Sequence, residues 1–178
     1  SRPRLLRYHA ALAVDGAGDV ITTNRVTLLA DVAGVVGRSH DLEETLGNVV
    51  DLVAKRLDAD VCSIYLTDTD LEFLTLRATR GLAADSVGVV RLEFGEGLVG
   101  IAARDREPVA VENAQADPRY RFFPGTGEER YVSLMAAPLL VRGVTIGVLV
   151  VQTEQARHFD PQDVELLQTC AQLIAPVV

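Results

Sequence analysis

The chain has 178 residues, of which 48% are hydrophobic and 24% are charged, so it is long enough for one domain with a substantial core. Its net charge of −8 argues against a nucleic-acid-binding protein, which would need a basic face to neutralise phosphates. No apolar run approaches the roughly 18 residues of a membrane-spanning helix. We therefore expect neither nucleic acid nor a membrane among the partners.

We expect residues 1–23 to form a tail or linker and residues 24–178 to form the domain. The apolar stretch "AALAV" in this segment is shorter than the roughly 7–15 apolar residues of a signal peptide. Cys62 and Cys170 lie far apart in apolar runs, which favours buried thiols over a disulfide and is typical of a reducing cytoplasm. The histidines are scattered without metal-ligand spacing, so we expect no metal site and no cofactor.

Two helices are predicted first in chain order. From Asn24, apolar residues recur at helical spacing up to Gly37, which we expect to end the first helix. The second helix begins with Asp41 as its N-cap and has Glu44 three residues later. A single apolar face runs along this helix, as in a helix that covers a sheet.

The apolar residues then alternate, which is typical of strands. In the strand predicted over 61–67, Ser63 and Tyr65 lie on the face opposite three apolar side chains. Those three are Cys62, Ile64 and Leu66. After a turn, a second strand returns antiparallel with one apolar face, formed by Leu74, Leu76 and Ala78. Beneath a covering layer, the hydroxyls of Ser63 and Tyr65 need hydrogen-bond partners, which a bound ligand can supply.

The rest of the chain predicts four more strands, one long loop and two more helices. The strands are expected at 89–94, 108–113, 132–141 and 144–153, and the long loop at 117–131. Arg142 and Gly143 form a tight turn between the last two strands, and the final helix begins with Asp160 and Pro161. This order predicts an α+β fold, with a central antiparallel sheet of about six strands flanked by helices.

The segment "GEGLVG", with Gly95, Gly97 and Gly100, has the spacing of a dinucleotide-binding motif. That reading requires a parallel βαβ unit, whereas the surrounding pattern predicts antiparallel hairpins. We interpret the glycines sterically, since they let the backbone turn sharply and let a short helix pack close to the sheet. The backbone N–H groups of Gly97 and Leu98 then face whatever fills the adjacent cavity.

Several of these segments together resemble a GAF domain over residues 24–178. They are "ATRGL", "GEGLVG", "PVAV", "AAPLLVRGVTIGVLVV" and a closing F-D-x-x-D-x-x-L-L pattern. The segments "DVCSIYL", "NAQADPRYRFFPGTGEERY" and "GVLVVQ" further resemble the N-terminal GAF domain of the nitrogen-related phosphoenolpyruvate-protein phosphotransferases. The resemblance implies a bacterial, cytoplasmic signalling protein whose phosphorylated histidine lies in a later domain. This chain is then the sensor and not the enzyme.

The resemblance also implies a small-molecule pocket between the sheet and a lid. Members of this family are linked to nitrogen status through glutamine, and other GAF domains bind 2-oxoglutarate or cyclic nucleotides. The five positions of the cyclic-nucleotide signature are occupied here by Gln152, Thr153, Phe159, Asp163 and Val164. Three of these five residues depart from the signature, which argues against a cyclic nucleotide. Methionine-sulfoxide-reducing GAF proteins need clustered cysteines, which two distant ones do not provide.

Residues 117–131 form the expected lid, because they hold four of the nine Phe and Tyr residues in a segment that suits neither helix nor strand. Thr126 followed by Glu129 predicts a capping box and a short helical turn. Glu129 is expected to meet a ligand ammonium, and the N–H groups of Gly97 and Leu98, or a lid arginine, to meet a carboxylate. The full set of candidate ligand-binding residues is Ser63, Tyr65, Gly97, Leu98, Asn113, Ala114, Tyr120, Phe123, Glu129 and Met135.

Two other functions stay open from the residues alone. An enzyme would need a nucleophile and a base, and no such pair can be named, so we assign no catalytic residue. A ligand-free dimerisation module would have its lid collapsed into the pocket. The first and last helices are apolar over more than one contact face, which predicts a homodimer formed through them and a route to downstream phosphotransferase domains.

Overall fold

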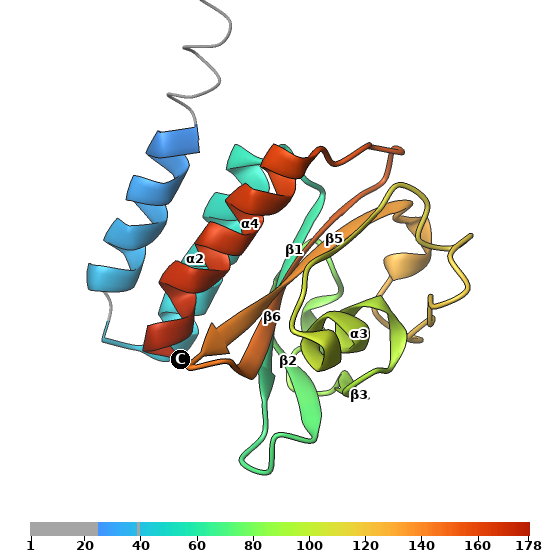
Figure 1. Cartoon of the computed structure of the whole chain (residues 1–178), viewed down its shortest axis with the longest axis horizontal. Coiled ribbons are helices and arrows are strands. Elements are labelled where there is room, and N and C mark those ends of the chain that lie inside the picture. Colours follow the sequence, from blue (N-terminus) through green and yellow to red (C-terminus); the bar gives the residue numbers. More distant parts are fainter. Residues whose placement is uncertain (1–24, 39) are drawn as a thin grey trace, which may run out of the picture.

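The computed structural model describes residues 25–38 and 40–178. Residues 1–23, for which we expected a tail or linker, lie outside this described part. Three layers are visible in Figure 1, where helices cover one face of a central sheet and a short helix with a long loop covers the other. This arrangement leaves each face of the sheet buried against its own hydrophobic cluster.

The sheet has six strands, all paired antiparallel, in the order β3-β2-β1-β6-β5-β4. Their bounds are β1 Val61–Thr67, β2 Phe73–Arg80, β3 Arg91–Glu93, β4 Val109–Val111, β5 Ser133–Val141 and β6 Val144–Thr153. Arg142 and Gly143 both have positive φ, of 50° and 76°, as a two-residue hairpin turn between β5 and β6 requires. The predicted α+β class and the strand number are confirmed.

The helical layer contains α2 (Leu42–Arg56), α4 (Pro161–Ile174) and the helical residues 25–38. The caps follow the prediction, since the Asp41 side chain accepts from the Glu43 backbone N–H at 3.0 Å and Asp160 caps α4. The prediction that Gly37 ends the first helix is wrong by at least one residue, because residue 38 is still helical. Leu28 and Val32 bury that helix in the cluster formed by α2 and α4.

A β-bulge in β2 corrects one predicted face. Leu74 and Leu76 lie on the lid side of the sheet, but Ala78 packs on the helical side. The register explains the change, because Ile64 pairs with Ala78 whereas Tyr65 pairs with Leu76, so Arg77 is an extra residue between the two pairs. In β1, Cys62, Ile64 and Leu66 share one face as predicted, and that face packs against the helices.

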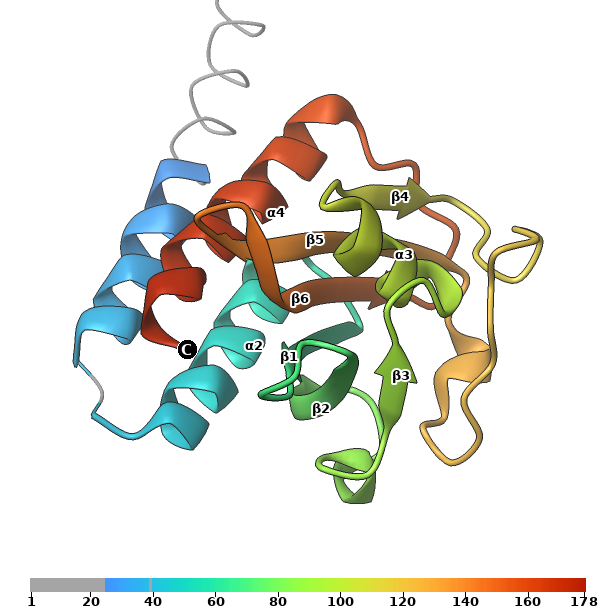
Figure 2. The same cartoon turned by 60° about the horizontal axis from the view of Figure 1, so that its bottom comes forward.

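The lid layer consists of α3 (Gly97–Asp105), the loop 112–132 and its 3₁₀ turn η2 (Glu128–Arg130). Figure 2 shows this loop in yellow and light orange on the same side of the sheet as α3. Gly100 supports the steric interpretation of the glycine motif, because a Cβ at this position would lie 2.6 Å from the Glu93 carbonyl oxygen. The glycine therefore lets α3 approach the end of β3.

Candidate ligand site

The lid is fixed to the body of the domain by contacts at several points. The Thr126 carbonyl accepts from the Ala83 N–H at 2.9 Å, and the Tyr131 hydroxyl donates to the Gly81 carbonyl at 3.0 Å. At the other end, the Arg121 guanidinium lies 3.0 Å from the Glu96 carboxylate, one residue before α3. These contacts hold the loop in place over the face of the sheet opposite α2 and α4.

Three of the four lid aromatics, Tyr120, Phe123 and Tyr131, pack inward, and one does not. Tyr120 and Phe123 are half-buried against the cluster that contains Tyr65 and Leu98. Phe122 points outward and is exposed. A Cβ added at Gly97 would lie 3.8 Å from the Phe123 ring, which places the start of α3 directly beneath the lid.

Glu128 is the one charged side chain in the buried class among residues 25–38 and 40–178, with 7% of its surface exposed. Its carboxylate accepts from the Phe123 backbone N–H at 2.7 Å. Burial raises the pKa of Glu128 to about 7; the Phe123 N–H opposes that shift, and the negative charge of Glu129 adds to it. A carboxyl whose pKa lies near neutrality under an aromatic lid marks a candidate site.

Tyr65 lies on the same face and is 4% exposed. Its hydroxyl makes no hydrogen bond with any residue that the structure describes, and it is not fully enclosed. Burial raises the pKa of Tyr65, and the nearby Glu128 charge raises it further. Tyr120 is shifted in the same way, with burial, Glu128 and Glu129 raising its pKa to about 12. Both phenols are therefore neutral hydrogen-bonding groups beside the Glu128 carboxyl.

The structure brings several of the predicted site residues together on the lid side. Tyr65, Leu98, Tyr120 and Phe123 belong to one hydrophobic cluster, and Gly97 at the start of α3 lies against Phe123. Ala114 belongs to the same hydrophobic cluster. Ser63 also faces the lid side, but its hydroxyl is already hydrogen-bonded to the Thr79 hydroxyl at 2.9 Å. The hydrogen-bonding capacity of Ser63 is thus partly used within the sheet.

Three predicted residues are placed elsewhere. Met135 packs on the helical side of the sheet, so we remove it from the candidate set. Asn113 is exposed and accepts from the Ala116 N–H at 3.2 Å, which closes a local turn. Glu129 is exposed, and Glu128 takes the buried position that we had expected for it.

The helical turn of the lid is present, but the predicted capping box is not its cause. The Thr126 hydroxyl accepts from the Glu128 N–H at 3.2 Å, two residues on, and the turn begins at Gly127 with φ of 76°. The capping-box interpretation expected a bond at Glu129, and this one-residue difference is why Glu128 was missed. The two adjacent glutamates were the feature of the sequence from which the buried carboxylate could have been predicted.

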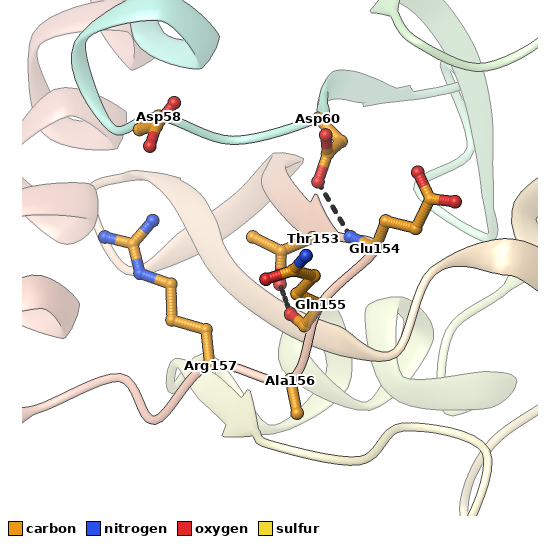
Figure 3. Close-up of a pocket in the computed structure, with 7 residues that line it drawn as sticks. All are labelled: Asp58, Asp60, Thr153, Glu154, Gln155, Ala156 and Arg157. Carbon is orange, nitrogen blue, oxygen red and sulfur yellow. Dashed lines mark hydrogen bonds between the residues drawn. The ribbon is translucent and has the colours of Figure 1, made fainter.

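A hollow of about 650 Å³ lies at the end of β6 and is drawn in Figure 3. Its polar groups are largely used in the local fold. The Glu154 N–H donates to Asp60 at 2.7 Å, the Thr153 hydroxyl donates to the Gln155 carbonyl at 2.7 Å, and the Arg157 guanidinium donates to the Leu57 carbonyl. Most of its lining residues are exposed, and we rank this hollow below the lid site.

The two cysteines are free and buried on the helical side of the sheet, so the prediction of buried thiols is confirmed. Burial raises the pKa of both thiols, for Cys170 to about 12, which makes them poor nucleophiles. Over the described ranges, no group of three or more His, Cys, Asp and Glu side chains is arranged to hold a metal ion. No helix in this part of the chain is both long and apolar enough to cross a membrane.

Comparison with known proteins gives consistent results. A GAF-domain family model matches residues 41–178. The chain is 34% identical over 153 residues to the "Phosphoenolpyruvate-dependent phosphotransferase system" protein of Escherichia coli (strain K12). The aligned region covers 86% of this chain and 20% of that protein. The chain thus spans about a fifth of the length of this relative.

Solved structures share the fold, and two of them are similar in sequence as well. The GAF domain from a phosphoenolpyruvate-protein phosphotransferase of Coxiella burnetii has a TM-score of 0.82 and 32% identity, with 87% of this chain and 92% of that chain covered. The GAF domain from the Acinetobacter phosphoenolpyruvate-protein phosphotransferase has a TM-score of 0.77 and 33% identity, with coverage of 86% and 91%. The family match over most of the sequence, and the shared fold of these relatives, show that this chain belongs to the GAF domain family.

Proposed function

We propose that the chain is the regulatory, small-molecule-sensing domain of a phosphoenolpyruvate-protein phosphotransferase, and that it responds to glutamine or a related nitrogen or carbon metabolite. The observation that carries this proposal is the unpaired Tyr65 hydroxyl beside the buried Glu128 carboxyl beneath the lid. The similarity to GAF domains of such phosphotransferases supports the parent protein. In this proposal the chain is not itself an enzyme, and it acts in the cytoplasm.

The proposed ligand lies between the lid and the start of α3. Its polar groups meet the Tyr65 hydroxyl and the N–H groups of the first turn of α3, at Gly97 and Leu98. Binding orders the lid through Tyr120 and Phe123, and the signal passes through the sheet to α4 and on to the downstream domains.

Thermal unfolding with and without metabolites tests this proposal. At about a hundred times its dissociation constant, a ligand stabilises the fold by about 2.7 kcal/mol. For a chain of this length that corresponds to a rise in melting temperature of roughly 5–11 °C. The metabolites are glutamine first, then 2-oxoglutarate, glutamate and cyclic nucleotides. The Tyr65→Phe variant is expected to show a smaller rise, since it loses one hydroxyl and keeps the ring.

A ligand-free dimerisation module is the second candidate. It is favoured by the inward packing of Tyr120 and Phe123, because rings that already fill the space beneath the lid leave less room for a ligand. This alternative predicts no change in melting temperature with any metabolite, while the dimer stays intact. Such a result would replace the sensing proposal.

A further inference from the structure

The Glu128 carboxylate has no cationic partner within the part of the chain that the structure describes. Its one hydrogen bond comes from the Phe123 backbone N–H. Other carboxylates of the domain do have a cation nearby, as Glu96 has Arg121 and Asp31 has Arg56. A carboxylate that is buried without a cation is costly to ionise, so its position under the lid needs another explanation.

The groups around Glu128 suit a positive charge. Tyr65 from β1 and Tyr120 from the lid are close enough to Glu128 for its charge to raise the pKa of each phenol. Aromatic faces attract cations, and the domain already uses this contact elsewhere, where the Arg91 guanidinium lies 3.8 Å from the centre of the Phe73 ring. Tyr65 is 4% exposed as a residue, and its hydroxyl, which bonds to no described residue, adds a free acceptor at this point.

We propose that Glu128, together with Tyr65 and Tyr120, binds the ammonium group of the ligand, so that the site accepts amino acids and rejects the corresponding 2-oxo acids. This inference rests on the proposed sensing function and narrows the class of ligand. It replaces Glu129, which is exposed, as the ammonium partner. A 2-oxo acid carries the same carboxylates as the amino acid but lacks the ammonium that would offset the charge of Glu128, and like charges at short range repel.

The same geometry predicts how binding depends on pH. An ammonium pairs with the ionised form of Glu128, whose pKa lies at about 7. The titratable groups that face this carboxyl are Tyr65 from β1, Tyr120 from the lid and Glu129 from its own turn, and both phenols stay neutral below pH 9 because their pKa values are raised. Affinity for an amino acid should therefore fall by about tenfold from pH 8 to pH 6.

Two matched pairs of ligands test the inference by titration calorimetry on the unmodified chain at pH 8. L-Glutamate is compared with 2-oxoglutarate, and L-glutamine with glutaric acid monoamide, which is glutamine without its α-amino group. We expect the amine-bearing member of at least one pair to bind more than tenfold tighter than its partner. If a ligand binds but neither amine-bearing member binds more than tenfold tighter than its partner, the inference is overturned and the sensing function stands.

Glu128→Gln is the decisive variant, because it removes the charge and keeps the shape of the side chain. We expect at least a tenfold loss of affinity for the amino acid and no remaining pH dependence between pH 6 and 8. The control is Glu129→Gln, one residue away on the exposed side of the turn, which should keep most of the affinity at pH 8, where Glu128 is ionised in both proteins. Unchanged affinity in Glu128→Gln contradicts the inference, and if that variant does not fold the ligand pairs still decide. If none of the four ligands binds, the proposed sensing function is rejected, and this inference with it.

Discussion

The two adjacent glutamates of the lid show how much a single residue position decides. Glu128 and Glu129 have the same side chain, but the 3₁₀ turn that contains both directs one inward and the other to solvent. The Thr126 hydroxyl selects between them by accepting from the Glu128 N–H. Burial raises the pKa of the Glu128 carboxyl, so the position of this one residue decides how it ionises.

Glu128 should make the stability of the free domain decrease as pH rises. Its pKa is about 7 in the folded state and about 4.5 in the unfolded chain, so the folded state holds the proton more tightly. The stabilising effect of that proton is present at low pH and is lost as pH rises from about 4.5 through 7. Between pH 5 and 8.5 we expect a loss of about 2–3 kcal/mol in unfolding free energy relative to Glu128→Gln.

Denaturant unfolding of both proteins at the two pH values measures this difference, since all other titratable groups are common to them. Glu129→Gln serves as the matched control; it removes the charge that adds to the raised pKa of Glu128, so its loss of stability with pH should be slightly smaller than that of the unmodified chain. Parallel pH profiles for the unmodified chain and Glu128→Gln would show that Glu128 titrates normally in the folded state.

At the scale of the elements, the sequence predicted the helices and most strand faces but not every register. Helix caps such as Asp41 and Asp160 are local, so their side chains determine where the helix begins. The bulge in β2 moved Ala78 to the other face, because alternation in sequence assumes that no residue is inserted in the ladder. Met135 was misplaced for a related reason, since β5 is buried on both faces and its pattern does not say which face is which.

The candidate site was predicted in outline and missed in detail. The aromatic residues of the lid are uncommon in a loop, so composition alone pointed to residues 117–131. The inward position of Glu128 depends on Gly127, whose positive φ starts the turn one residue later than a capping box would. Such backbone choices are decided by packing of the whole loop on the sheet and cannot be derived from side-chain spacing.

Thr126 is expected to be the main internal support of the lid. Its hydroxyl is buried; it donates to the Phe123 carbonyl at 2.9 Å and accepts from the Glu128 N–H. Thr126→Val keeps the shape but leaves both backbone groups without this partner, which should cost about 2 kcal/mol. The melting temperature should then fall by roughly 4–8 °C.

Thr126→Ser is the control, because it retains the hydroxyl and loses a methyl group. It should lose less stability than Thr126→Val and keep the affinity for any ligand. If Thr126→Val is as stable as the unmodified chain, the turn is held by packing and not by these two hydrogen bonds.

At the scale of the whole molecule, the helical layer uses most of its apolar surface within the chain. Leu167, Cys170 and Ile174 of α4 are buried against the sheet, and Leu28 and Val32 bury the helix at 25–38 against the same cluster. The broad apolar pattern that suggested a partner helix is therefore explained largely by intrachain contacts. What remains outward among the described residues includes Val26, which is 62% exposed, and Val177.

We propose that this remaining surface forms a homodimer through the N- and C-terminal helices, and sedimentation at tens of micromolar tests it. The unmodified chain should sediment as a dimer, and Val26→Asp should weaken the dimer by about tenfold, which corresponds to about 1.4 kcal/mol. Val89→Asp is the matched control, because Val89 is equally apolar and even more exposed but lies two residues before β3, outside the terminal helices. A monomer in the unmodified chain, or equal effects of the two substitutions, would mean that the terminal helices are not the interface. A route for the ligand signal would then have to run through α4 alone.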